Sequence, residues 1–133
     1  MNEAIVGAWR ATITNPGGDP HVNLTTFLPG GIVFNAFPTP TPAPPGAKHN
    51  LEYFTTAMGS WETVGDGQVA LRFESLGVDE HGASIGSHVV TATLDVTAGG
   101  GWSGQFTLAV LDTGGAQVAS VGGSVSGARI PSR

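Results

Sequence analysis

Residues 5–14 read IVGAWRATIT, and residues 127–129, near the other end of the chain, read GAR. The first segment alternates apolar and polar side chains, which is the period-two pattern of a β-strand with one buried face. Trp9 lies on its apolar face, and the last strand-like segment carries Arg129. We expect the indole and the guanidinium to meet, which requires a sheet that curls until its first and last strands pair.

The rest of the chain consists of similar short runs separated by turns rich in glycine and proline. Eight runs are predicted, at residues 5–14, 21–28, 32–37, 51–64, 68–75, 85–97, 102–111 and 117–129. No segment combines a 3.6-residue period with helix caps, so little helix is expected. Tight turns favour an antiparallel meander, and closure protects the edges of a sheet that carries few charges. The sequence therefore predicts an all-β protein, an eight-stranded antiparallel up-and-down β-barrel.

Length and composition exclude several classes of function. The chain has 133 residues, of which 40% are hydrophobic and only 11% charged, with a net charge of −5. One domain, residues 1–133, is expected. The few basic residues are scattered, which argues against a nucleic-acid partner. No run approaches the roughly 20 apolar residues that span a bilayer, and no secretion signal is recognisable. We therefore expect no membrane partner and a cytoplasmic location.

Two short motifs resemble those of the lipocalin-like, or calycin, group of small β-barrels. Gly7-Ala8-Trp9 is similar to the Gly-x-Trp of the first strand in that group, and Arg129 to the arginine of its last strand. The resemblance implies that Arg129 stacks on Trp9 and donates to carbonyl groups at the closed end of the barrel. The segments Gly59-Ser60-Trp61-Glu62 and Gly127-Ala128-Arg129-Ile130 also resemble parts of short bacterial barrels.

The chain departs from better-known barrels of this kind. Secreted lipocalins usually have a signal peptide, a disulfide and a C-terminal helix, and none of these is visible; the chain has no cysteine. Haem-binding nitrobindin-like barrels carry a histidine near the C-terminus, whereas the last histidine here is His88. The four histidines show neither His-x-His nor His-x-x-x-His spacing. We expect neither a cofactor nor a metal site.

The large apolar side chains are numerous enough either to line a cavity or to fill the barrel. An eight-stranded barrel lies at the boundary between a packed interior and one that holds a single small ligand. The many Ala, Gly, Thr and Ser residues on the strands favour a cavity. We predict that the barrel encloses a small, largely apolar molecule, contacted by Phe34, Met58, Trp61, Phe73, Trp102 and Phe106.

Three polar residues are candidates for orienting a ligand or for acid–base chemistry. His88 falls on the apolar face of its strand, where burial would lower its pKa and favour the neutral imidazole. Tyr53 and Glu62 would join it if they point inward. The alternative to a binding protein is thus a cofactor-free enzyme, such as an isomerase, cyclase or hydrolase. In the non-catalytic alternative, His88 is hydrogen-bonded within the core, and Tyr53 and Glu62 are exposed. A third hypothesis is a structural β-protein that forms a homodimer.

Residues 38–46 read PTPTPAPPG, a composition typical of an extended polyproline II segment. Proline lacks the N–H donor that a sheet ladder requires, so this segment is not expected to join the sheet. Its position between two strands predicts a stiff flap over one end of the barrel. An inert loop and a docking peptide for another protein are the alternatives.

Overall fold

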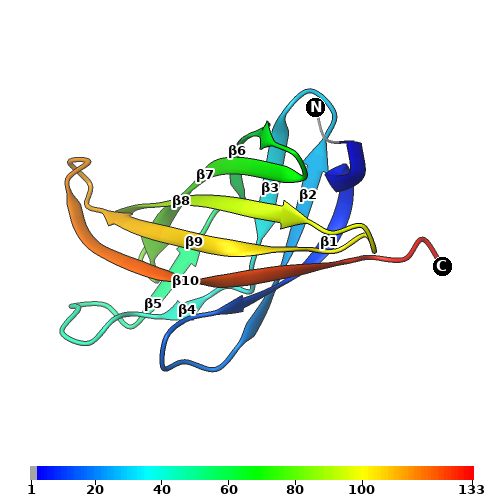
Figure 1. The fold of residues 1–133 in the computed structure, drawn as a ribbon. Coiled ribbons are helices and arrows are strands. Elements are labelled where there is room, and N and C mark those ends of the chain that lie inside the picture. The colour runs from blue at the N-terminus through cyan, green and yellow to red at the C-terminus, as the bar shows by residue number, and fades with distance from the viewer. Residues whose placement is uncertain (1–2) are drawn as a thin grey trace.

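The computed structural model describes residues 3–133, so the first two residues of the predicted domain lie outside the described part. The protein is a closed antiparallel β-barrel with up-and-down connectivity and almost no helix, as predicted (Figure 1). The eight barrel strands are β1 (Gly7–Thr14), β2 (His21–Leu28), β3 (Ile32–Ala36), β6 (Ala57–Gly65), β7 (Gln68–Asp79), β8 (Ser84–Val96), β9 (Trp102–Leu111) and β10 (Gln117–Arg129). Two short strands, β4 (Thr41–Pro42) and β5 (Leu51–Phe54), extend the sheet beside β7, and a 3-10 turn, η1 (Glu3–Ile5), precedes β1. Within residues 3–133 no helix is long and apolar enough to cross a membrane.

The barrel closes where β1 pairs with β10, and there Trp9 lies opposite Arg129 in the register. The guanidinium carbon lies 4.2 Å from the centre of the indole ring. The same guanidinium donates hydrogen bonds to the carbonyl oxygens of Val6 (3.0 Å) and Ala4 (2.8 Å). The predicted contact between the two ends of the chain is therefore confirmed, and it ties the turn η1 to the last strand.

Gly7 allows the chain to fold back over the end of the barrel. Its φ of +132° lies in a region that residues with a side chain rarely adopt, and a Cβ there would collide with the Arg129 guanidinium. The resulting bend directs η1 inward, so that Ile5 is fully buried and its carbonyl oxygen accepts a 2.8 Å hydrogen bond from the Trp9 indole. The first residues of the described chain thus close one end of the barrel.

The run predicted as one strand over residues 51–64 is interrupted at residues 55–56. β5 pairs with residues 77–79 at the far end of β7, whereas β6 pairs with residues 68–74. At the break, the hydroxyl of Thr55 accepts a 3.0 Å hydrogen bond from the amide of Leu76. The interruption shifts the alternation by one residue, so Phe54 in β5 and Trp61 in β6 both lie on the lumen side. β7 also continues to Asp79, beyond the predicted end at residue 75, because this extension pairs with β5.

The proline-rich segment corrects one prediction. Thr41–Pro42 forms β4 and pairs with Leu51 and Glu52 of β5, although the segment was not expected to join the sheet. The pairing is compatible with proline because β4 is an edge strand, and an edge strand forms backbone hydrogen bonds to a neighbouring strand along only one of its sides. The loop that follows is held by Glu80, whose carboxylate accepts hydrogen bonds from the amides of Asn50 (2.9 Å) and Leu51 (3.1 Å). These backbone bonds lower the pKa of Glu80 to about 2.

Candidate ligand-binding site

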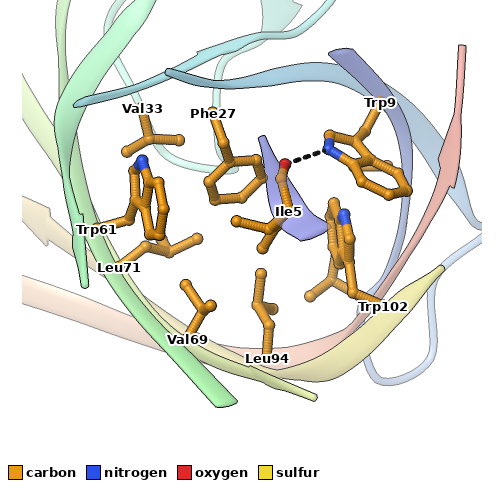
Figure 2. Close-up of a cluster of buried hydrophobic side chains, with 11 residues drawn as sticks. Ile5, Trp9, Phe27, Val33, Trp61, Val69, Leu71, Leu94 and Trp102 are labelled. Atoms are coloured by element: carbon orange, nitrogen blue, oxygen red, sulfur yellow. Dashed lines mark hydrogen bonds between the residues drawn. The ribbon is translucent and has the colours of Figure 1, made fainter. Parts of the chain in front are cut away.

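One end of the barrel is filled by a cluster of large side chains. Figure 2 shows these side chains meeting around Ile5 in the centre of the barrel. The rings of Trp9 and Trp102 meet edge to face with centroids 5.9 Å apart, and Phe27 packs in the same way against Trp61 and Trp102 at 6.0 Å. Aromatic pairs favour this geometry, which adds to the stabilisation from burial. We call this packed end the closed end.

Beyond the closed end the barrel contains a cavity of about 170 Å³. No Asp, Glu, Lys or Arg is among its lining residues. The apolar lining residues are Ala11, Ile13, Phe37, Ala57, Leu71, Phe73, Val90, Ala92, Leu94, Trp102, Phe106, Leu108 and Val125. The polar lining residues are Asn15, His21, Asn23, Thr25, Asn35, Ser75 and His88. His21 is exposed to solvent, so the cavity reaches the surface at the end of the barrel where β2 begins, which we call the mouth.

Trp102 forms part of the cavity wall because Gly127 leaves room for it. The two residues lie opposite each other in the β9–β10 register. A Cβ on Gly127 would overlap the carbon atoms of the indole ring, so only glycine allows Trp102 to lie across β10. The indole therefore lies over Gly127 and belongs both to the closed end and to the cavity lining.

His88 lies near the mouth and is half-buried. Its ring packs against Phe54 with centroids 4.3 Å apart, and it lies opposite Ser75 in the β7–β8 register. Burial lowers the pKa of His88 from its ordinary value because the charged imidazolium loses water, and the carboxylate of Glu52 opposes this shift. The imidazole is therefore neutral at neutral pH and can accept or donate a single hydrogen bond in the cavity.

Four of the predicted site residues lie together around this cavity. His88, Phe73, Trp102 and Phe106 all line it, and they come from β7, β8 and β9. Their alternation with outward-facing polar residues correctly indicated the lumen face of these three strands.

Three of the predicted ligand contacts lie outside the cavity lining in the structure. Trp61 belongs to the closed end, where it is 3% exposed and its indole donates a 3.0 Å hydrogen bond to the carbonyl oxygen of Leu28. Phe34 and Met58 oppose each other in the β3–β6 register and lie outside the cavity lining. Met58 is 61% exposed, because its neighbour Ala57 takes the inward position on β6.

Two predicted acid–base residues also lie outside the cavity. Tyr53 is exposed, and its neighbour Phe54 contacts His88 instead. Glu62 is exposed because it follows Trp61, which faces the closed end. Of the three candidates for proton transfer, only His88 reaches the lumen.

The structure adds a polar group that the sequence analysis did not single out. Asn23, Thr25 and Asn35 are buried and line the cavity from β2 and β3. The hydroxyl of Thr25 donates a 2.8 Å hydrogen bond to Oδ1 of Asn35. The sequence could have indicated this group through the spacing of Phe27, Thr25 and Asn23, because all three share one face of β2 and point inward if Phe27 does.

Comparison with known proteins leaves the family undecided. No model of a known protein family matches the chain, and no curated protein shows significant sequence similarity to it. The structure supports the small barrel that the resemblance implied, while membership of the calycin group stays a prediction. Among the side chains of residues 4–133 there is no group of three or more His, Cys, Asp or Glu that could hold a metal ion.

Proposed function

We propose that this protein binds one small, largely apolar molecule inside the barrel. The observation that carries the proposal is the cavity of about 170 Å³, lined mainly by apolar side chains and reaching the surface at the mouth. An apolar cavity of about 150 Å³ is enough to hold benzene. A molecule of one or two small rings fits this volume, and a larger one would have to project through the mouth.

The rigidity of the surroundings supports binding in this cavity. All lining residues except Asn15 and Phe37 lie on paired barrel strands, and the closed end below them is packed with aromatic rings. A wall formed in advance does not have to be ordered by the ligand, which lowers the entropic cost of binding. The cavity is therefore suited to selecting a ligand by shape.

The proposal is tested by filling the cavity. Ala92 lines it from β8, and the Ala92→Leu variant places three extra carbon atoms in the lumen. Ala70 lies between the inward residues Val69 and Leu71, so Ala70→Leu makes the same change on the outer face. Tryptophan fluorescence, with Trp102 in the cavity wall, would report titration with small aromatic compounds. We expect binding to the natural protein and to Ala70→Leu, and at least tenfold weaker binding to Ala92→Leu. Saturable binding that is equal in all three proteins would exclude the cavity as the site.

A second candidate function is a cofactor-free enzyme, such as an isomerase, cyclase or hydrolase. The position of His88 favours it, because a neutral imidazole in a partly desolvated cavity can take up or deliver a proton. In such an enzyme, His88→Gln would abolish turnover of an enclosed compound and leave its affinity within about threefold. Turnover by the variant at the natural rate, measured by mass spectrometry of products, would remove this candidate.

A further inference from the structure

The wall of the cavity is divided into a polar side and an apolar side. Five of its seven polar residues, Asn15, His21, Asn23, Thr25 and Asn35, belong to β2, β3 and the loop before β2. The wall formed by β8 and β9 contributes Val90, Ala92, Leu94, Phe106 and Leu108, together with Trp102 and His88. We call Asn23, Thr25 and Asn35 the amide wall.

The order of the strands places these two sides opposite each other. In the closed ring of eight barrel strands, β2 and β8 are four strands apart in either direction, and so are β3 and β9. The amide wall therefore faces the apolar side chains of β8 and β9 across the lumen. A ligand between them meets hydrogen-bonding groups on one edge and mainly apolar side chains on the opposite edge, where His88 and Trp102 carry the polar atoms.

The amide wall has hydrogen-bonding capacity that the protein does not use. The 2.8 Å bond from Thr25 occupies Oδ1 of Asn35, which leaves the two N–H donors of that amide unbonded to any residue within 3–133. The side chain of Asn23 is 9% exposed and makes no hydrogen bond within the same residues, and its Oδ1 is buried without a partner. On the β9 side, Nε1 of Trp102 is a further unused donor, because it is buried without an acceptor among the described residues.

This arrangement favours one class of ligand. An amide group that has no protein partner gains a hydrogen bond from a ligand that offers it a matching polar atom. Among the described residues, the four N–H groups of Asn23 and Asn35 have no partner, whereas Oδ1 of Asn23 is the one oxygen of the amide wall without any partner, so the predominant matching group on a ligand is an acceptor. A carboxylate is a poor match, since no Lys or Arg lines the cavity to neutralise it.

We propose that the cavity selects an uncharged molecule of one or two small rings that carries a carbonyl oxygen on one edge. The carbonyl accepts hydrogen bonds from the amide wall through Asn35 and Asn23, and the remaining edges pack against β8 and β9. This inference rests on the proposed function, because it specifies the ligand of the same cavity. It assigns Asn23 and Asn35 as residues that determine specificity.

Three probes of similar size separate the inference from the proposed function: ethylbenzene, acetophenone and benzoate. Dissociation constants would be measured by isothermal titration calorimetry at pH 7.5. We expect acetophenone to bind about tenfold tighter than ethylbenzene, as one net hydrogen bond provides, and benzoate to bind weakest. Equal affinity for acetophenone and ethylbenzene would overturn the inference and leave the proposed function standing. If none of the three probes bound, both would fail for ligands of this size.

The assignment of the amide wall is tested by Asn23→Leu, which preserves the approximate shape of the side chain and breaks no side-chain hydrogen bond of the protein. We expect acetophenone to lose its advantage over ethylbenzene in this variant, while the midpoint of thermal unfolding stays unchanged or rises. The matched control is Gln105→Leu, which makes the same kind of change at an exposed position of β9 and should keep the advantage. Retention of the full advantage in Asn23→Leu would overturn the role of Asn23.

Discussion

Replacing Arg129 with alanine tests how the closed end of the barrel is held. The variant loses two hydrogen bonds, to the carbonyl oxygens of Val6 and Ala4, and the stack on Trp9. Arg129 is exposed, so each bond is counted at about 1 kcal/mol and the stack at about 0.5–1 kcal/mol. We expect the free energy of unfolding to fall by about 2.5–3 kcal/mol. For a chain of 133 residues this corresponds to a midpoint lower by about 9–11 °C.

Urea unfolding, followed by tryptophan fluorescence, measures this loss. Arg10→Ala is the control, since Arg10 is an exposed residue of the same strand pair that makes no side-chain hydrogen bond or ion pair within residues 3–133. It should change stability by no more than about 0.5 kcal/mol. Arg129→Lys should lie between the two, because lysine keeps the charge but not the planar fork of donors. If Arg129→Ala were as stable as Arg10→Ala, the guanidinium would not hold the closed end, and the reasoning would be refuted.

Three further changes test other parts of the barrel. Gly127→Ala should displace Trp102 and weaken cavity binding at least tenfold, seen as a shifted indole emission maximum; unchanged emission would contradict the close approach. Glu80→Gln should speed hydrogen exchange of the backbone amides at residues 50–51 at pH 7, because these amides donate to the Glu80 carboxylate. In the natural protein the carboxylate should protect them from exchange until the pH approaches about 2. Equal exchange rates in both proteins would contradict this role of Glu80. His88 has a lowered pKa, so the unfolded chain binds its proton more readily, and stability should be complete above about pH 6.5 and decline as the pH falls below it. Urea midpoints of His88→Gln should show a smaller decline over this range, and an unchanged slope would refute the assignment.

The closure of the barrel could be predicted because it depends on residues close to both ends of the chain. Trp9 and Arg129 are recognisable as a pair only when the first and last strands are assumed to meet, and the register places them opposite each other. The lumen faces of β7, β8 and β9 followed from simple alternation. These strands are regular enough for the period of two to hold from one end of the site to the other.

The amide wall could not be predicted from alternation, because β2 reverses the usual pattern. Val22 and Leu24 are 36% and 50% exposed, whereas Asn23 and Thr25 are 9% and 4% exposed. A reader of the sequence would place the two aliphatic residues inside. The position of Phe27, fully buried at the closed end, fixes the opposite phase. Tertiary packing at one residue therefore decides the orientation of the whole strand.

The outward positions of Tyr53 and Met58 have a different cause. The break at residues 55–56 changes which side chains of the following strand face inward, and no glycine or proline marks it. Simple alternation would place Tyr53 and Trp61 on the same face of the sheet, but the structure places them on opposite faces. A shift of a single residue moves every later side chain to the other face. This is why Met58 lies outside the barrel and Ala57 lines the cavity.

The cavity exists because the large side chains are concentrated at one level of the barrel. Four strands carry an aromatic ring at the closed end and a much smaller residue at the next inward position toward the mouth. The pairs are Trp9 and Ala11 on β1, Phe27 and Thr25 on β2, Trp61 and Gly59 on β6, and Trp102 and Gly104 on β9. Large residues at both levels would fill the lumen, and small residues at both would leave the end of the barrel unsupported. This change from a large to a small side chain occurs on strands spread around the barrel. The aromatic side chains therefore support the walls of the cavity while leaving its volume free, which is the arrangement that a preformed binding site requires.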